Sequence, residues 1–378
     1  MDIYEKALKL HEEKKGKLEI VSKVEIKDKN DLSLAYSPGV AAVSKLIAND
    51  KKSAYTHTNK GNTIAVISDG SAILGLGNLG ALAAIPVMEG KCVLFKEFAN
   101  VDAIPICLDT QDSEEIIKTI QNLAPNYGGI NLEDISAPRC FEIEARVRES
   151  LDIPVLHDDQ HGTATVVLAG LINALKIKNT SQDKVKIIIN GAGAAGLAIT
   201  NLLIKYGFSQ IIVLDSKGAI YEGRGDLNSA KESVAKYTNK EKKAGDLADV
   251  IKDVDVFIGV SQGNILKPEM VKSMNKQAII FALANPTPEI MPEEALTAGA
   301  LLVATGRSDY PNQINNVLAF PGIFRGALDN KVKQITDKML IKAAENLAAL
   351  VADPGPYEIL PNVFDKRVAL VVADAIRD

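Results

Sequence analysis

The chain has little cysteine, no tryptophan and no apolar segment long enough to cross a membrane. Its three cysteines are an odd number without CxxC spacing, which argues against a disulfide framework or a zinc–thiolate site and favours a reducing compartment. The longest apolar run, residues 164–175, is too short for a bilayer and contains an asparagine. The charged N-terminal stretch is unlike a signal peptide. We therefore expect a cytoplasmic protein without a membrane partner.

An excess of positive charge is also missing. The formal net charge is −5, and the lysines and arginines are scattered, so no basic face suited to nucleic-acid phosphates is expected. With 47% hydrophobic and 24% charged residues, the composition is that of an ordinary globular protein. A length of 378 residues is enough for about two domains.

Short apolar segments alternate with helical patterns along most of the chain. The expected strands are residues 63–68, 93–95, 104–108, 154–156, 185–189, 210–214, 254–260, 278–283 and 301–304. The expected helices are residues 2–17, 79–89 with a break at Pro86, 113–122 with Ser113 as its cap, 163–176, and one ending at Tyr206. This alternation predicts an α/β protein: an N-terminal α/β domain of residues 1–160, then a Rossmann-type doubly wound parallel sheet with C-terminal helices in residues 161–378.

A glycine-rich turn follows the expected strand at residues 185–189 and opens a helix. It consists of Gly191, Ala192, Gly193, Ala194, Ala195 and Gly196. Backbone N–H groups and the helix dipole at such a turn can hold a pyrophosphate. The next strand ends at Asp215, where an acidic residue could meet a ribose hydroxyl. The turn therefore predicts a dinucleotide site, although a turn of this kind can also bind nothing.

A second GxGxxG pattern occurs at residues 75–80, but it is the weaker candidate. Asp69 and Gly70 interrupt the strand before it, and no strand with a clean acidic end follows. We interpret it as a loop that brings backbone close to a substrate.

Four carboxylates lie in two adjacent pairs near the expected domain boundary. They are Glu133, Asp134, Asp158 and Asp159. Clustered oxygen ligands suit Mg²⁺ or Mn²⁺, although each pair alone could be a turn or a helix cap. His157 and His161 do not make a zinc motif, because no glutamate follows His157 and Gly162 interrupts the helix. We expect structural or supporting imidazoles there.

Taken together and in this order, these motifs resemble the malic enzyme family in its short bacterial form. Further matching stretches are residues 36–40, 73–80, 89–91, 131–134, 157–163, 284–287 and 315–322. The chain stops at Asp378, without the acyltransferase-like extension of some bacterial relatives. The resemblance implies oxidative decarboxylation of (S)-malate to pyruvate and CO₂ with reduction of NAD or NADP, decarboxylation of oxaloacetate, and a homodimer. In this scheme the N-terminal domain binds the substrate.

The resemblance also implies roles for individual residues. It makes Lys91 the general base, Tyr36 the general acid and Asp158 the residue that orients Lys91. The implied metal ligands are Glu133, Asp134 and Asp159. The implied contacts to substrate or nicotinamide are Asn285 and Asn316. The chemistry suits these residue types, because a buried lysine near a divalent cation can have its pKa lowered towards neutrality. Without the resemblance, a surface lysine and a packed tyrosine would be the better interpretations.

Several questions stay open at this stage. Asp215 favours NAD, whereas Ser216 and Lys217, with help from Arg224, could hold the 2′-phosphate of NADP, so we expect use of both coenzymes. Larger eukaryotic relatives carry a substrate-clamping arginine where this chain has Ala72, so we expect neutral groups to replace it. The subunit that supplies Tyr36 is undetermined. The alternative functions are a metal-free Rossmann dehydrogenase, which would not need the acidic pairs, and a nucleotide-sensing module without catalysis.

Overall fold

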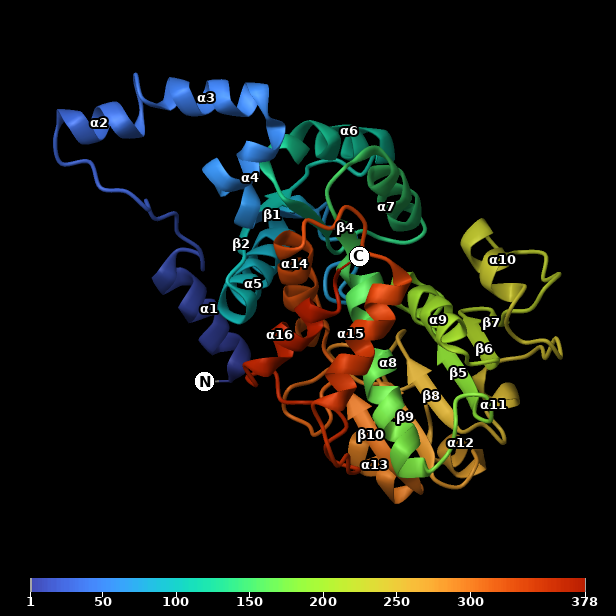
Figure 1. Cartoon of the computed structure of the whole chain (residues 1–378). Helices are drawn as coiled ribbons and strands as arrows, with labels where there is room; N and C mark the ends of the chain where they lie inside the picture. Colours follow the sequence, from blue (N-terminus) through green and yellow to red (C-terminus); the bar gives the residue numbers. More distant parts are fainter. Residues whose placement is uncertain (1, 378) are drawn as a thin grey trace.

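The structure, a computed structural model, describes residues 2–377 and contains two β-sheets in successive parts of the chain (Figure 1). The first is wholly parallel with strand order β2-β1-β3-β4, and its strands are β1 (Thr63–Ser68), β2 (Asp102–Cys107), β3 (Gly129–Leu132) and β4 (Val155–His157). The second has the order β10-β9-β8-β5-β6-β7, and its strands are β5 (Lys186–Asn190), β6 (Gln210–Asp215), β7 (Gly218–Ala219), β8 (Val256–Gly259), β9 (Ala278–Ala282) and β10 (Ala300–Thr305). All neighbours pair in parallel except β6 and β7. The predicted α/β class with a Rossmann-type sheet is confirmed.

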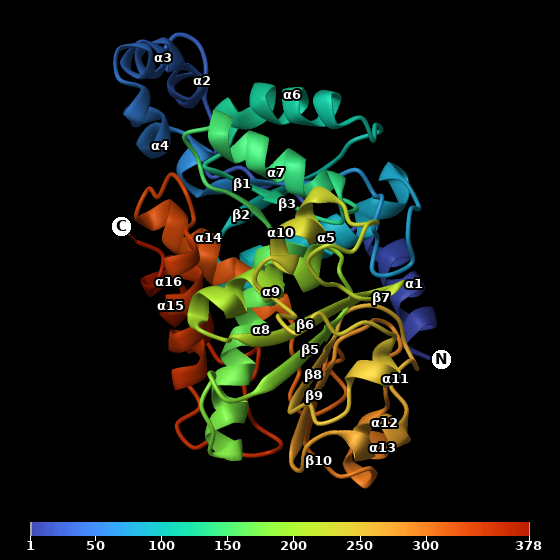
Figure 2. The ribbon, with the colours of Figure 1, turned by 90° about the vertical axis from the view of Figure 1, so that its right-hand side faces the viewer.

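Helices cover both faces of each sheet (Figure 2). Those before the second sheet are α1 (Ile3–Lys14), α2 (Lys29–Ala35), α3 (Val40–Asn49), α4 (Ala54–His57), α5 (Ala81–Ala99), α6 (Ser113–Leu123), α7 (Arg139–Ser150) and α8 (Asp158–Lys178). The others are α9 (Ala194–Tyr206), α10 (Ser229–Ala235), α11 (Leu247–Val250), α12 (Pro268–Ser273), α13 (Pro292–Thr297), α14 (Phe320–Asp329), α15 (Asp337–Ala349) and α16 (Arg367–Asp374).

One hydrophobic core joins the two sheets. Side chains alternate along β1, so Ile64 and Val66 enter this core while the residues between them face the layer of α6 and α7. The C-terminal helices return to the first sheet, where Phe320 and Phe324 of α14 pack edge-on against Phe95 of α5 at ring-centroid distances of 4.6 and 5.5 Å. The hydrophobic core between the two sheets is therefore closely packed.

Two predictions for the chain between β1 and β2, a strand at residues 93–95 and a helix break at Pro86, were wrong. Residues 93–95 are not a strand but belong to α5, which runs from Ala81 to Ala99 and continues through Pro86. The helix tolerates Pro86 near its beginning because the carbonyl that loses its partner belongs to Leu82, whose side chain is exposed to solvent. The buried face of α5 includes Lys91 and Phe95, four residues apart, so the apolar triplet follows a helical period.

Helix α8 begins earlier than expected, at Asp158 rather than Thr163, and runs without interruption across the expected domain boundary. Gly162 does not break it. A Cβ at Gly162 would lie 1.8 Å from Oδ1 of Asp158, so the glycine makes room for this carboxylate inside the first turn. Similarly, α6 is capped by Asp112, whose side chain accepts from the Glu115 N–H, and not by Ser113.

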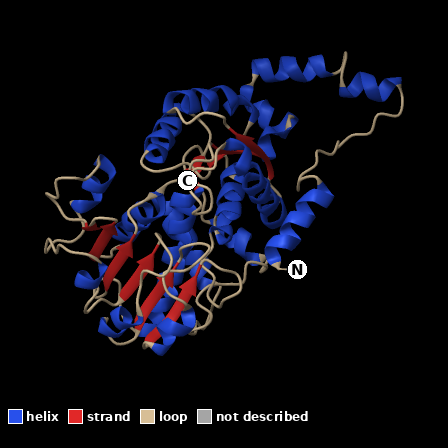
Figure 3. Ribbon diagram, turned by 180° about the vertical axis from the view of Figure 1, so that it is seen from behind, coloured by secondary structure: helices blue, strands red, loops and turns tan. Residues whose placement is uncertain are grey.

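The N-terminal segment extends away from the rest of the molecule (Figures 1 and 3). Helices α2 and α3 contain no buried residue. Within the described chain, side-chain hydrogen bonds of residues 18–49 stay inside this segment, and one ion pair, Lys23 with Asp102 at 3.9 Å, reaches the body. None of the helices among residues 2–377 is long and apolar enough to span a bilayer.

Candidate active site

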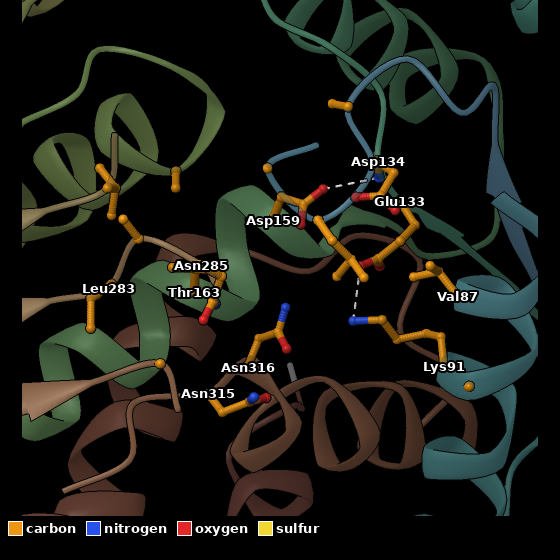
Figure 4. Close-up of a pocket in the computed structure, with 18 of the residues that line it drawn as sticks. Val87, Lys91, Glu133, Asp134, Asp159, Thr163, Leu283, Asn285, Asn315 and Asn316 are labelled. Carbon is orange, nitrogen blue, oxygen red and sulfur yellow. Dashed lines mark hydrogen bonds and ion pairs between the residues drawn. The ribbon is translucent and has the colours of Figure 1, made fainter. Parts of the chain in front are cut away.

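The acidic pairs meet at the carboxyl edge of the first sheet. The chain runs from β1 outward to β2 on one side and to β3 and β4 on the other, so the strand order reverses between β1 and β3. Ligands bind at such reversal points in open parallel sheets. Glu133 and Asp134 follow β3 here, and Asp158 and Asp159 follow β4. The two pairs are in contact, because the Asp134 backbone N–H donates to Oδ2 of Asp159 at 3.0 Å (Figure 4).

Lys91 reaches this edge from α5 and is only 8% exposed. Its Nζ lies 2.7 Å from Oδ2 of Asp158 and 2.9 Å from Oε1 of Glu133, above the ring of Phe320. Burial alone lowers the pKa of Lys91, but the Asp158 and Glu133 carboxylates outweigh it and raise that pKa well above its ordinary value. We had expected the pKa of Lys91 to be lowered towards neutrality. It is not lowered here, because the two carboxylates face the amine directly.

The carboxylates around Lys91 repel one another. Burial, followed by the charges of Asp159 and Glu133, raises the pKa of Asp134 to about 8. Oδ2 of Asp134 is buried without a hydrogen-bond partner, as is Oδ1 of Asp158. Crowded, desolvated carboxylates with unused oxygens are the donor chemistry that Mg²⁺ or Mn²⁺ requires.

The described residues do not yet form a closed metal shell. As they stand, no group of three or more His, Cys, Asp or Glu side chains among residues 2–377 is arranged to hold a metal ion. The reason is visible in the contacts: Glu133 is turned towards Lys91, and Asp159 accepts a backbone hydrogen bond. The carboxylate oxygens are ligands that suit a hard divalent cation. To bind the cation, the Glu133 carboxylate would have to leave its ion pair with Lys91.

The expected supporting role of an imidazole is found at His161, whereas both ring nitrogens of His157 are buried without a hydrogen-bond partner. His161 Nε2 lies 3.0 Å from Oε2 of the buried Glu144, and the backbone N–H of His157 donates to Oε1 of the same side chain. Burial raises the pKa of Glu144, but the charge and hydrogen bond of His161 outweigh it and lower that pKa below its ordinary value. Glu144 thereby fixes the beginning of α8, and no sequence motif pointed to it.

A cavity of about 650 Å³ opens above these groups (Figure 4). Lys91 and three carboxylates line one part of it, and Asn285 and Asn316 line another. The second glycine pattern contributes Gly75, where a Cβ would lie 2.7 Å from the Asn285 carbonyl oxygen at φ +74°. The loop therefore packs closely against the Asn285 turn and reaches the cavity wall.

The dinucleotide turn also lies at a reversal of strand order, between β5 and β8. At Gly191, with φ +125°, a Cβ would lie 2.7 Å from the Val260 carbonyl oxygen, and at Gly196 it would lie 1.7 Å from the Gly191 carbonyl oxygen. A Cβ at Gly193 would meet nothing within 4 Å. Gly191 and Gly196 thus allow close packing of the backbone. Gly193 leaves the N-terminus of α9 open to a phosphate.

A second cavity, of about 620 Å³, extends from this turn. It shares Val260 and Ser261 with the first cavity, so the two are contiguous. Its lining residues from the predicted coenzyme set are Gly191, Ala192, Gly193, Asp215 and Ser216; Ala195 lines the first cavity. An extended dinucleotide could therefore lie along both.

Two basic side chains hold Asp215 at the end of this cavity. Its Oδ2 lies 2.5 Å from Arg224 Nη2 and 2.6 Å from Lys231 Nζ. Burial would raise the pKa of Asp215, but these hydrogen bonds outweigh it and lower that pKa well below its ordinary range. Lys217 donates its backbone N–H to Asp215, but its ammonium pairs with Asp226 at 2.9 Å. Lys231, which the sequence argument missed, lines the cavity instead.

Tyr36 does not lie with the other predicted catalytic residues. It caps the C-terminal end of α2 on the projecting segment, is 69% exposed, and does not line either cavity. By contrast, Lys17 and His11, which precede the projecting segment in the chain, do line the first cavity. No sequence signal pointed to them, because Lys17 is 72 residues away from its α5 partner Glu89 and both residues lie in a stretch of ordinary surface composition.

Comparisons with known proteins agree with this geometry. Residues 15–148 match the profile of the malic enzyme N-terminal domain, and residues 160–377 match that of the malic enzyme NAD-binding domain. The chain belongs to the malic enzyme family. It is 57% identical to the bifunctional malic/malolactic enzyme of Bacillus subtilis, over 100% of this chain and 92% of that protein.

Other relatives of the family differ in length and coenzyme. The NADP-dependent malic enzyme of Rhizobium meliloti is 49% identical over 98% of this chain but only 51% of its own length. Among solved structures, the NAD-dependent malic enzyme of Thermotoga maritima superposes with a TM-score of 0.95 at 49% identity, covering 98% of both chains. The malic enzyme fold is therefore present over almost the whole chain.

Proposed function

We propose that this chain oxidises (S)-malate to pyruvate and CO₂ with reduction of NAD or NADP, and that it also decarboxylates oxaloacetate. The observation that carries this proposal is Lys91, buried between Asp158 and Glu133 in a cavity contiguous with the dinucleotide turn. In this proposal residues 1–160 supply the acid–base and metal-binding side chains, and residues 161–378 supply the coenzyme site.

The reaction needs one base and one acid from the protein. Lys91 takes the proton of the C2 hydroxyl with its amine in the neutral form, and Asp158 orients that amine. Bound NAD or NADP would accept the hydride from C2. The carbon–carbon bond to the second carboxylate then breaks, CO₂ leaves, and Tyr36 protonates C3 of the resulting enolate. Glu133, Asp134 and Asp159 would hold Mg²⁺ or Mn²⁺, which supplies Lewis-acid stabilisation of the negative oxygen when bound. Asn285 and Asn316 orient the substrate or the nicotinamide.

Removing a metal ligand should stop both partial reactions. Asp159→Ala should lower malate oxidation and oxaloacetate decarboxylation by at least about 100-fold, since even outer-shell changes cost 10–100-fold at metal sites. Steady-state assays with increasing Mn²⁺, and of wild-type protein after exhaustive chelation, check this. Asp152→Ala, at an exposed surface position, is the control. Undiminished turnover of the chelated wild-type protein would contradict the metal assignment.

Coenzyme choice depends on how the Asp215 cluster responds to a 2′-phosphate. With NAD, the Asp215 carboxylate can accept a hydrogen bond from the ribose 2′-hydroxyl while Arg224 and Lys231 neutralise it. With NADP, the same two cations can pair with the phosphate. We infer that Lys231, which lines the cavity, is the main phosphate ligand and that Lys217 assists from the rim.

Two lysine variants separate these contributions. Lys231→Ala should raise the KM for NADP by about tenfold or more, because a charge-assisted contact to the phosphate is lost, and should change the KM for NAD much less. Lys217→Ala should show the same selectivity with a smaller effect. Side-by-side kinetics with both coenzymes give the answer. Equal losses for the two coenzymes in Lys231→Ala would show that this lysine only supports Asp215.

We further propose a homodimer in which each subunit supplies Tyr36 to the site of the other. The projecting segment carries ten exposed large apolar side chains: Leu18, Ile20, Val21, Val24, Ile26, Leu32, Leu34, Tyr36, Val40 and Leu46. A segment of this kind needs a surface to cover it. Because the described body lacks Tyr36 at its own cavity, a second copy of the chain is the occupant that would complete the site.

A matching apolar surface lies at the mouth of the cavity. It consists of Leu74, Leu76, Leu79, Leu82 and Ile85, all of which are exposed. Leu74 also lines the cavity that contains Lys91. Docking of the partner's α2 and α3 against this surface would bury apolar groups on both sides and would carry Tyr36 towards the substrate.

The free thiols of the three cysteines agree with the cytoplasmic location that we propose.

A further inference from the structure

Lys17 places an additional positive charge in the wall of the substrate cavity. Its Nζ donates to the Pro86 carbonyl oxygen at 2.7 Å, and its backbone N–H donates to Oε2 of Glu89 at 3.1 Å. Both acceptors belong to the part of α5 that immediately precedes Lys91. The turn after α1 is therefore attached to the same helix that carries the catalytic lysine.

Two glycines make room for this attachment. Gly16 adopts φ +103°, and a Cβ there would lie 3.0 Å from Oε1 of Glu89. On α5, a Cβ at Gly90 would lie 3.3 Å from Nζ of Lys17, so the ammonium would have to move by a few tenths of an ångström to admit a side chain there. A glycine in the middle of a helix costs about 0.5–1 kcal/mol relative to alanine. The close approach of Lys17 is a physical reason for accepting that cost at Gly90.

The ammonium of Lys17 has bonding capacity to spare. A lysine ammonium has three donor hydrogens, and the Pro86 carbonyl takes one of them. Within residues 2–377, no carboxylate forms an ion pair with Lys17. Lys91, the other lysine of this cavity wall, is already committed to Asp158 and Glu133. Lys17 is thus the lysine of the described cavity wall whose ammonium is in no ion pair, and the charge that acts on it is that of the nearby Glu89 carboxylate.

Malate brings two carboxylates into the cavity, one bonded to C2, which carries the hydroxyl, and a second bonded to C3. We propose that Lys17 binds the second carboxylate, the task for which Ala72 offers no guanidinium. This inference rests on the proposed function and replaces our expectation of a purely neutral clamp. Because the second carboxylate leaves as CO₂, the contact acts mainly on the bound substrate and so on KM.

Lys17→Ala tests this inference through the difference between one and two carboxylates. The KM for malate should rise by about 10- to 100-fold, with kcat within a few-fold of wild type, since a charge-assisted hydrogen bond is lost. (S)-Lactate has the same hydroxyl and first carboxylate but lacks the second, so its Ki as a competitive inhibitor should not change. Lys17→Arg should restore most of the malate affinity, and Lys14→Ala, at an exposed position of α1, is the matched control.

Two outcomes would overturn the proposal. An unchanged KM for malate would show that Lys17 does not touch the substrate. A parallel rise of the KM for malate and the Ki for lactate would show that Lys17 only attaches the α1 turn to α5. Failure of the wild-type protein to oxidise malate is a different result, because it would contradict the proposed function itself.

Discussion

Lys91→Ala should lower malate oxidation by about 10²–10⁴-fold, the usual contribution of a positioned acid–base group. The physical reason is that, within residues 2–377, Lys91 is the lysine paired with this carboxylate cluster, at 2.7 Å from Asp158 and 2.9 Å from Glu133. Oxaloacetate decarboxylation should fall much less, because oxaloacetate has no C2 hydroxyl proton to remove. Initial rates with both substrates, at saturating coenzyme and Mn²⁺, measure the difference.

Lys96→Ala is the matched control for this experiment. Lys96 lies on the same helix, five residues later, but it is exposed and pairs with Asp102. Its removal should leave both rates near those of the wild type. If Lys91→Ala retained most of its malate oxidation, or if both reactions fell equally, the base would have to be sought elsewhere in the cavity.

Mixed dimers should recover activity that neither parent variant has. We expect Tyr36→Phe and Lys91→Ala each to be nearly inactive in malate turnover. When the two are co-expressed, one site of each heterodimer would combine the intact Lys91 of one subunit with the intact Tyr36 of the other. Isolated heterodimers should therefore have about half the wild-type specific activity, as follows from two-fold symmetry.

The same experiment has a clear contrary outcome. If each subunit supplied its own Tyr36, every site of the heterodimer would contain one defect and no activity would return. A monomeric wild-type protein in sedimentation equilibrium would likewise contradict the proposal that each subunit supplies Tyr36 to the site of the other. Tyr4→Phe is the control, because Tyr4 is an exposed tyrosine on α1 of the same N-terminal segment.

Local signals were sufficient for much of the fold and of the site. Strand β1 was predicted at its observed bounds, because its uninterrupted apolar run suits a strand that is buried on both faces. The turn at residues 191–196 was recognised because strand, glycines and helix follow one another directly along the chain. The acidic pairs were likewise contiguous in sequence. Where chemistry resides in neighbouring residues, the sequence by itself determined it.

Other features were decided by tertiary packing. The segment at residues 93–95 looked like a strand because β-branched and aromatic residues favour strands, but packing of Phe95 against α14 selects the helix. The contact of Lys91 with Asp158, like the position of Lys17 beside Gly90, joins parts of the chain that are far apart. Such contacts depend on how whole elements pack, and no local propensity specifies them.

The sequence by itself therefore determined which chemical groups this protein has and which of its short segments carry them. The tertiary structure decided which of these groups share one cavity. It brought Lys91 to the carboxylates, gave Lys231 rather than Lys217 a place in the cavity beside the turn at residues 191–196, and left Tyr36 exposed on the projecting segment. The physical reason is that burial of apolar surface fixes the relative positions of sheets and helices, and these positions set every distance between side chains remote in sequence.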